Sequence, residues 1–586
     1  MSDYPIPDVI RESPHRHDDD LLTAGLGLAG LRDPRKPAFT DATTPTPTEL
    51  RRRAIHASWR AIADLEPTGG FGEIYGQAPR IPGREYHAFA RLPGAQTSHR
   101  VLLQAPDDFD RRIRCLIVTA SPGSRGIYGG IALAGAWGLP RGCAVVYTDK
   151  GAGSGYFDAH SGSGVRLDGT RAAAGEDVLE FEPLIADPEG GIGIKHAHSG
   201  DNPEASWGDH VLQALNFGLA MLDRAYPDAA PFSPENTRII ATGLSNGGAA
   251  ILQAAGRDTA NQLDGAVAIS PNVLTPNRGR AFYDYTSEVA LLIGSALAAP
   301  SLLGIAQARH ADAMPDHVAW GEGLAEAGVL STNRSAEYAE EALSRLHTMG
   351  WSTAALQAAL LTGDTEIWRA AGAVYAGSYL CRPMGELPCE EGFLARVPDT
   401  QGQLRPAGAL LRSTWWADAP GIPPVWVWSP RAWRLDGLSS SRCFAYMPCL
   451  PNLPTRMPRH AYCAQVLRQQ PSPCHTKTYL SGWCMAMTMD WFLSRSVASR
   501  MSTGYAPRGA SRCSGGSRMC STSTPYSVGR RWPHVICRCW PTPMPRWTPC
   551  GRGLVNGSLW QAAPSPCPLV CAVQRRLPLH TSDWMP

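Results

Sequence analysis

The sequence predicts an α/β fold with a mostly parallel sheet. Short apolar runs of strand length recur through the first 277 residues, and stretches with helical spacing lie between them. Runs that are apolar at nearly every position suit strands buried on both faces, which is the situation in a parallel sheet covered by helices. Alternating strands and helices are the pattern of α/β proteins.

Five runs carry the strand prediction, at residues 99–105, 114–120, 143–148, 237–242 and 265–269. The helical spacing is clearest in 208–225, where Leu212, Leu215, Leu219 and Leu222 share one face. That helix is expected to end before Pro227, because proline cannot continue a helix. These elements define a predicted core domain, residues 1–277.

Residues 278–412 are rich in alanine and leucine at helical spacing, for example in 335–348 and 353–361, and show little strand character. Because an α/β site opens at the carboxyl ends of the strands, a helical insertion at this point is predicted to cover the site as a lid or cap. A second helical subdomain without a gating role is the alternative. Residues 413–424 are expected to return to the core.

The overall charge excludes several classes of partner. The 586 residues carry a formal net charge of +2, which gives no reason to expect nucleic acid or an anionic membrane as a partner. No apolar run approaches the roughly 20 residues that span a bilayer. The N-terminal residues 1–8 have neither a basic nor an apolar region of the kind found in signal peptides, so a cytoplasmic location is expected.

A candidate nucleophile lies in Gly243-Leu-Ser-Asn-Gly247, between the last-but-one strand and an alanine-rich helix. This is the G-x-S-x-G pattern, in which Ser245 would occupy a sharp turn and the next backbone N–H, that of Asn246, would bind an oxyanion. A second oxyanion donor is expected from the loop 120–129, at Ser121 or Gly123. The alternative for that loop is a glycine-rich turn without a catalytic role.

Three further segments carry polar residues that could bind a ligand. Lys195, His196 and His198 precede His210, but no carboxylate or cysteine completes a zinc set, so we expect no metal and a structural or substrate-facing loop. The segment 148–155 lacks the Gly-Lys-Ser/Thr ending of a phosphate loop, so no nucleotide is expected. The acidic and histidine-containing segment 15–20 is expected to be a solvated surface.

Several of these stretches together resemble the D-(−)-3-hydroxybutyrate oligomer hydrolases, over residues 17 to 424 or so. The matching segments are Asp18-Asp-Asp-Leu-Leu-Thr-Ala-Gly-Leu-Gly27, Gly123-Ser-Arg-Gly-Ile-Tyr-Gly129, Thr148-Asp-Lys-Gly151, Lys195-His-Ala-His198 and Gly243-Leu-Ser-Asn-Gly-Gly248. The resemblance implies an α/β-hydrolase-type serine esterase that needs no cofactor, with Ser245 as nucleophile. The implied substrates are small oligoesters of 3-hydroxybutyrate, met in polyhydroxybutyrate degradation. Some members are secreted, which leaves an extracellular location open, and the oligomeric state is undetermined.

The composition changes abruptly after residue 424. Residues 425–586 contain twelve of the sixteen cysteines, ten of the eighteen tryptophans, eighteen arginines, one lysine, three aspartates and no glutamate. Globular domains are about a quarter charged, with both signs common. In an α/β-hydrolase the catalytic acid and histidine follow the serine and would fall in this tail, where neither has a recognisable setting.

The genetic code offers an explanation for the tail. When codons 484–492 are read one nucleotide earlier, they give V-[H/Y]-G-x-D-x-G-L-V, which resembles the segment that carries the acid in α/β-hydrolases. The same shift at 520–525 permits V-Q-H-F-D-A, which resembles the family's histidine segment. Both segments lie in the expected order. We therefore interpret the tail as displaced in reading frame from near Pro424 onward and not natively folded.

Three alternatives stay open at this point. The tail could be a genuine cysteine-rich domain, although no pair of C-x-x-C motifs and no export signal support it. The parent activity could be that of another carboxylester hydrolase, of the aryl or feruloyl type. The chain could also be a truncated relic without catalysis. Because the acid and base are missing, a protein with this sequence as written, called here the literal chain, is expected to be inactive and poorly folded.

Overall fold

The computed structural model describes most of the first 410 residues and two short pieces of the tail. The described ranges are 4–71, 77–151, 155–183, 191–273, 282–310, 317–326, 328–362, 366–381, 383–384, 393–394, 396–398, 404–408, 427–428 and 534–537. All of them lie within one compact unit, Met1–Cys539.

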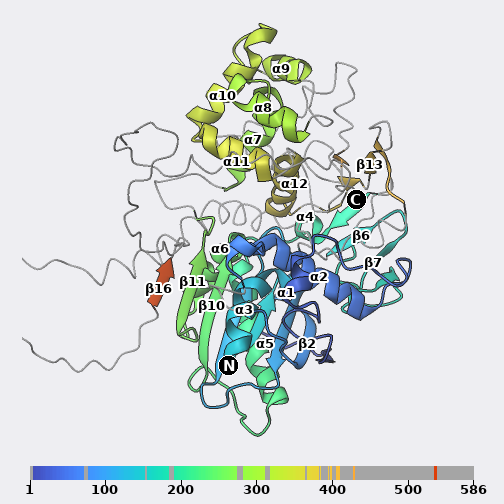
Figure 1. The fold of residues 1–586 in the computed structure, drawn as a ribbon, viewed down its shortest axis with the longest axis vertical. Helices are drawn as coiled ribbons and strands as arrows, with labels where there is room; N and C mark the ends of the chain where they lie inside the picture. Colours follow the sequence, from blue (N-terminus) through green and yellow to red (C-terminus); the bar gives the residue numbers. More distant parts are fainter. Residues whose placement is uncertain are drawn as a thin grey trace, which may run out of the picture. The chain divides into compact units, whose positions relative to one another are not determined.

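An eight-stranded mixed sheet forms the centre of this unit (Figure 1), with the strand order β1-β2-β3-β5-β4-β10-β11-β16. The strands are β1 (Arg11–His15), β2 (Gly83–Ala90), β3 (His99–Pro106), β4 (Cys115–Ala120), β5 (Ala144–Thr148), β10 (Arg238–Leu244), β11 (Gly265–Ile269) and β16 (His534–Cys537). All pairings from β5 to β16 are parallel, and those from β1 to β5 are antiparallel. The predicted α/β-hydrolase-like, mostly parallel sheet is confirmed, and its five predicted strands are β3, β4, β5, β10 and β11.

Both faces of the sheet are buried, which explains why its strands are apolar at nearly every position. In β4, Leu116 and Val118 pack in one hydrophobic cluster with α5 (Trp207–Ala225) and α6 (Asn246–Arg257). The alternate residue Ile117 belongs to the cluster on the other face. Successive side chains of a strand point to opposite faces, so each run contributes to two cores.

The second face is covered by helices from the N-terminal part and by the segment after β4. They are α1 (Gly27–Arg32), α2 (Pro47–Ile62), the helical turns Ile127–Gly130 and Ile131–Gly135, and α3 (Ala136–Gly138). The start of α2 is fixed by a capping box, in which the Thr46 side chain accepts from the Glu49 N–H and Glu49 accepts from the Thr46 N–H. Pro47 at the first helical position adds a preset φ angle.

A smaller four-stranded antiparallel sheet follows β5 in the chain. It consists of β6 (Tyr156–Asp158), β7 (Ser163–Val165), β8 (Arg171–Ala173) and β9 (Ile192–Ile194), in the order β8-β7-β6-β9. The short helix α4 (Lys195–His198) continues directly from β9. Two two-stranded pairs, β12 (Phe393–Leu394) with β15 (Val427–Trp428) and β13 (Arg396–Pro398) with β14 (Leu404–Pro406), lie later in the chain.

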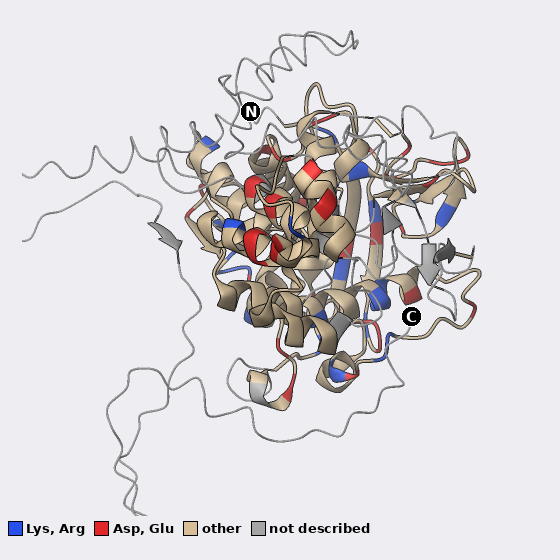
Figure 2. Cartoon of the chain, turned by 90° about the horizontal axis from the view of Figure 1, so that it is seen from above, with Lys and Arg blue, Asp and Glu red and all other residues tan. Residues whose placement is uncertain are grey.

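Six helices between residues 282 and 379, called here the helical region, have a hydrophobic core of their own. They are α7 (Phe282–Ala296), α8 (Pro300–His310), α9 (His317–Glu326), α10 (Tyr338–Thr348), α11 (Thr353–Thr362) and α12 (Glu366–Tyr379). Helix α10 is amphipathic: it buries Tyr338 and Leu346 while Glu340 is exposed. Figure 2 shows acidic positions gathered on the helical region. The boundaries 278–412 and the lid role stay predictions.

None of the described helices is by itself long and apolar enough to cross a bilayer. Only the pair Asp284–Ala296 and Pro300–Ala308, bent by 90°, reaches the necessary length and composition together.

The tail contributes a strand to the central sheet, which the sequence analysis did not foresee. In β16, His534–Cys537 pairs in parallel with β11, from Gly265↔His534 to Ala268↔Cys537. The run His-Val-Ile-Cys contains two β-branched residues, which suits a strand. The interpretation of the whole tail as not natively folded is therefore wrong for these four residues. Residues 429–533 and 538–586 lie outside the described part.

A buried carboxylate ties the N-terminal elements to the sheet. Glu85 on β2 is 0% exposed and accepts hydrogen bonds from Arg51 of α2 at 2.8 and 3.0 Å and from the Tyr128 hydroxyl at 2.9 Å. Burial raises the pKa of Glu85, but Arg51 and His15 outweigh it and hold the pKa well below its usual value. Because Tyr128 closes the loop that follows β4, this network also anchors one wall of the site described below.

The same network corrects one prediction. The segment 15–20 was expected to be a solvated surface, and His17 and Asp18 are exposed. His15 and Asp20, however, are 6% and 1% exposed. His15 Nδ1 lies 2.9 Å from Asp19 Oδ2, and Asp20 accepts the backbone N–H groups of Leu22 and Thr23. Distant residues pair with this segment as well: His15 Nε2 lies 3.3 Å from Glu85, and Asp19 lies 2.7 Å from Arg51.

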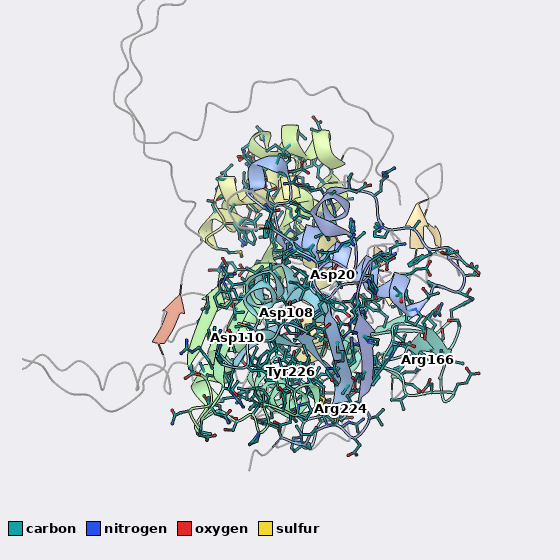
Figure 3. The ribbon with its side chains drawn as sticks, turned by 60° about the horizontal axis from the view of Figure 1, so that its bottom comes forward. Asp20, Asp108, Asp110, Arg166, Arg224 and Tyr226 are labelled. Atoms are coloured by element: carbon teal, nitrogen blue, oxygen red, sulfur yellow. The ribbon has the colours of Figure 1, made fainter. Side chains whose placement is uncertain are left out.

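The amino edge of the parallel strands has contacts of its own, away from the site. The Tyr226 hydroxyl, just after α5, donates to the Pro106 carbonyl at the end of β3. Arg224 pairs with Glu12. Figure 3 shows Arg224 next to Tyr226, and Asp108 next to Asp110. This end of the sheet is closed by packing.

We predict that Glu85→Ala destabilises the fold by about 3–5 kcal/mol, because it leaves Arg51 charged, buried and without its main partner. Urea unfolding followed by circular dichroism measures the change. The control is Asp107→Ala, which breaks an exposed pair with Arg16 and should cost no more than about 1 kcal/mol. Equal effects of the two substitutions would contradict the prediction.

Candidate active site

Ser245 occupies a strained turn between β10 and α6. Its backbone has φ 58° and ψ −126°, and the helix begins at the next residue. A non-glycine residue with positive φ is strained and persists only where its surroundings enforce it. Here the Ser245 N–H donates to the Ile269 carbonyl of β11 at 2.9 Å, and the side chain is exposed. The serine is thus held above the carboxyl ends of the strands.

The two glycines of the motif are required by close backbone contacts. A Cβ on Gly247 would lie 2.4 Å from the Ala120 carbonyl oxygen, at the end of β4. A Cβ on Gly243 would lie 2.4 Å from the Gly247 carbonyl oxygen. No side chain fits at either position, so the turn can come this close to β4 only with glycine. The loop after β4 is thereby brought next to Ser245.

Two backbone donors face this region. Asn246 is the first residue of α6, where N–H groups lack an intrahelical partner and the helix dipole favours negative charge. Gly123 lies against it: a Cβ on Gly123 would be 3.2 Å from Asn246 Cβ. In the described part of the chain no acceptor is found for the Gly123 N–H. These two amides can act as an oxyanion hole.

The third predicted donor does not fit this role. The Ser121 N–H donates to the Thr148 carbonyl at 3.0 Å, which extends the β4–β5 ladder by one residue. Its amide is therefore engaged, and its buried hydroxyl oxygen has no hydrogen-bond partner among the described residues. Ser121 supports the loop, and Gly123 remains the candidate donor.

A cluster of buried polar side chains lies beneath the elbow. Glu204 contacts Lys150, the Nε2 of His196 at 2.8 Å and the Nδ2 of Asn246 at 3.0 Å. Lys150 also contacts the Asn246 side-chain oxygen. All four residues are 9% exposed or less. The side chain of Asn246 is thus fixed from two sides, which holds the start of α6 in place.

The charges of this cluster fit an ion pair with a neutral histidine. Burial lowers the pKa of Lys150, and Glu204 counteracts it. Burial raises the pKa of Glu204, but Lys150 and His196 more than offset it, so the pKa lies far below its usual value. Burial and the neighbouring Lys150 cation lower the pKa of His196 to about 4. Near neutral pH the cluster holds Lys150 charged, Glu204 ionised and His196 neutral.

The segment predicted as a structural or substrate-facing loop is a buried turn of helix. Lys195, His196 and His198 are each 2% exposed. Lys195 Nζ lies 3.4 Å from Glu180, and His198 Nδ1 accepts the Ile194 N–H at 2.9 Å. Only His196 joins the cluster beneath the elbow. Among the described residues no group of three His, Cys, Asp or Glu side chains could hold a metal ion.

The catalytic base and acid are not part of this cluster. No histidine of the described part is hydrogen-bonded to the Ser245 hydroxyl. The positions where the re-read tail suggested the acid and the histidine, 484–492 and 520–525, lie outside the described residues. The described site therefore comprises a strained serine, two candidate oxyanion donors and a supporting network.

Glu204, Lys150 and Tyr375 were not predicted as site residues. Lys150 was quoted only within the segment Thr148-Asp-Lys-Gly151. Glu204 stands alone in a loop, and Tyr375 belongs to α12, far along the chain. The Tyr375 ring lies 5.3 Å from the His196 ring and 5.1 Å from Lys150 Nζ. No pattern in the sequence connects these three positions.

Comparisons with known proteins agree with the resemblance. The model of the family described as 3HB-oligomer hydrolase (3HBOH) matches residues 5–427. A D-(-)-3-hydroxybutyrate oligomer hydrolase of Paracidovorax citrulli is 34% identical over 459 residues, 70% of this chain and 64% of the relative. One from Cupriavidus metallidurans is 34% identical over 453 residues, 70% of this chain and 62% of the relative. The chain thus spans a little under two thirds of the length of these curated relatives.

Solved structures give weaker matches. The rice cell wall degrading esterase LipA of Xanthomonas oryzae has 10% identity and a TM-score of 0.22 over 52% of this chain and 72% of that chain. Feruloyl esterase B of Aspergillus oryzae has 12% identity and a TM-score of 0.22 over 37% of this chain and 33% of that chain. The fold assignment therefore rests on the sheet order and the elbow described above.

The buried histidines predict a loss of stability in acid. The pKa is lowered to about 4 for His196 and to about 3 for His198 and His210, in each case mainly by burial. Histidine in the unfolded chain titrates near pH 6.5. Between about pH 6.5 and 4 the unfolded chain therefore binds more protons than the folded chain, and the free energy of unfolding decreases as the pH is lowered. Each histidine contributes up to about 1.4 kcal/mol per pH unit. Asp149, whose pKa burial raises to about 6, offsets part of this.

Urea unfolding at pH 7, 6 and 5 measures this dependence. The slope of the unfolding free energy against pH reports the number of protons taken up on unfolding. The substitution His198→Asn should reduce this number by up to one, whereas His160→Asn, at an exposed position, should leave it unchanged. A stability that is flat or rises on acidification would refute the prediction.

Proposed function

The chain belongs to the 3HB-oligomer hydrolase family, and from this premise we propose that it is a serine esterase. Its proposed substrates are 3-hydroxybutyrate dimers and short oligomers, which it converts to monomers during polyhydroxybutyrate degradation. The observation that carries the proposal is the position of Ser245, strained and exposed on the turn before α6. The α/β-hydrolase fold presents its nucleophile in this way.

The proposed reaction is acyl transfer through Ser245. Its hydroxyl oxygen attacks the ester carbonyl carbon, and the N–H groups of Asn246 and Gly123 bind the oxyanion of the tetrahedral intermediate. The ester bond then breaks, the alcohol half of the oligomer leaves with a proton, and water hydrolyses the acyl-enzyme. A histidine held by an acid must take and return the proton. Glu204 and Lys150 contribute by fixing Asn246.

We also propose that the tail is displaced in reading frame from near Pro424. The family match ends at residue 427, close to the position where the composition changes. The missing acid and base are then encoded in the shifted frame at codons 484–492 and 520–525. This proposal accounts for a site that has a candidate nucleophile and candidate oxyanion donors but no base or acid among the described residues. A protein with the sequence as written would then be an impaired esterase.

A fluorophosphonate probe tests the nucleophile, because it labels only an activated serine. We expect a frame-restored chain to be labelled at Ser245 and to hydrolyse hydroxybutyrate dimer and trimer faster than aryl or feruloyl esters. Ser245→Ala should abolish labelling and lower kcat by at least about 10⁴-fold. Ser344→Ala, at an exposed helix position, is the control and should change neither. Preference for aryl esters would assign the chain to another class of carboxylester hydrolase.

Resequencing the gene across codons 415–435 tests the frame. We expect one nucleotide to be missing or extra relative to the uninterrupted frame. The literal chain should then show activity lower by several powers of ten than the restored chain, because it lacks two triad members. Comparable turnover by the two chains would overturn the frame proposal. A normal sequence together with an inactive protein would support the reading as a relic.

A further inference from the structure

The helical region places one side chain at the candidate site. Tyr375 of α12 is 6% exposed, and its ring packs edge-to-face on His196 with 5.3 Å between centroids. Lys150 Nζ lies 5.1 Å from the centroid of the same ring. A cation near an aromatic face is attracted to the ring, and burial strengthens this attraction. The ring is thus held on the cluster beneath the elbow.

Packing of α12 as a whole fixes this position. Ala373 and Val374 belong to one hydrophobic cluster with Ile192 and Ile194 of β9 and Ala197 of α4. The helix therefore lies against the segment that carries His196. Tyr375 does not reach the site by a flexible loop, since its neighbours on the helix are themselves buried.

The hydroxyl end of Tyr375 lies near Gly123 and the side chain of Asn246. A Cβ on Gly123 would lie 3.5 Å from the Tyr375 hydroxyl oxygen and 3.5 Å from the Asn246 side-chain oxygen. Gly123 and Asn246 are the two residues whose amides form the candidate oxyanion hole. The phenol oxygen is thus a neighbour of both residues.

The hydroxyl is in the right protonation state to donate. Burial raises the pKa of Tyr375 well above its usual value, and the nearby Glu204 carboxylate raises it further. The phenol therefore keeps its proton throughout the neutral range. A neutral O–H beside two amide N–H groups is the kind of donor that oxyanion holes use.

We propose that Tyr375 donates a hydrogen bond to the ester carbonyl oxygen of the bound oligomer, together with the Asn246 and Gly123 amides. This inference rests on the proposed function and adds a substrate-binding residue from the helical region to it. The helical region is then part of the binding site itself, in addition to any role as a cover. Substrate binding and the seating of α12 on α4 are coupled through this one side chain.

The test uses the frame-restored chain with Ser245→Ala, so that the ester stays intact during the measurement. Isothermal titration calorimetry measures the Kd of the hydroxybutyrate dimer in this background, alone and with Tyr375→Phe. The phenylalanine keeps the ring contacts with His196 and Lys150 and removes only the hydroxyl. We expect the Kd to rise about 3- to 10-fold, the usual effect of one lost hydrogen bond.

Two controls separate a hydrogen bond from a packing effect. Tyr379→Phe removes a hydroxyl one turn further along α12, where the ring lies 5.7 Å from that of Tyr375, and should leave the Kd unchanged. An ether analogue of the dimer, with a methylene in place of the ester carbonyl, lacks the carbonyl oxygen to which Tyr375 is proposed to donate. Its Kd should not respond to Tyr375→Phe, and the Tm of the variant should match that of its parent.

The outcomes distinguish this inference from the function on which it rests. If the dimer binds and Tyr375→Phe leaves its Kd unchanged, the role of Tyr375 is refuted and the proposed substrate stands. An equal loss for the dimer and the ether analogue would also refute it, because the effect would then come from packing. If the Ser245→Ala chain binds no dimer, the substrate assignment fails and the role of Tyr375 fails with it.

Discussion

The site depends on one buried carboxylate. Glu204 contacts Lys150 at the end of β5, His196 on α4 and Asn246 at the start of α6, and it joins three segments that are remote in sequence. A buried charge is tolerated only when it is paired and hydrogen-bonded. Loss of any one of these contacts would therefore leave a buried polar group without a partner and weaken the remaining contacts. The position of Asn246, and with it the amide beside Ser245, follows from this arrangement.

The strain at Ser245 has to be sustained by the surrounding fold. A positive φ at a serine is unfavourable by about 1–3 kcal/mol, and the turn also needs glycine at 243 and 247 to approach β4. Its compensation comes from the backbone bond to Ile269 and from the hydrophobic face of α6, which packs Ile251 and Ala254 into the core. Reactive geometry and fold stability are thus supplied by the same helix.

The sequence predicts those parts of the fold that follow from a local pattern of residues within one segment. Strands β4, β5 and β10 could be located because burial on both faces makes them apolar throughout, and the elbow because its glycines follow from local geometry. The small sheet β6–β9 escaped notice because its strands are three residues long. His15 and Glu204 could not be assigned, since their burial depends on partners such as Glu85 and Lys150 that no local pattern identifies. The base could not be located because no histidine of the tail stands in a recognisable setting.

The strand β16 has a consequence for the fate of the chain in the cell. It covers the outer edge of β11, and its own outer side has no partner strand among the described residues. An uncovered strand edge offers a row of backbone N–H and C=O groups on which another polypeptide can assemble. A chain whose tail holds this edge by only four residues is open to intermolecular pairing and aggregation. Aggregation and its clearance in the cell, more than the catalytic site, would then decide how much of this protein accumulates.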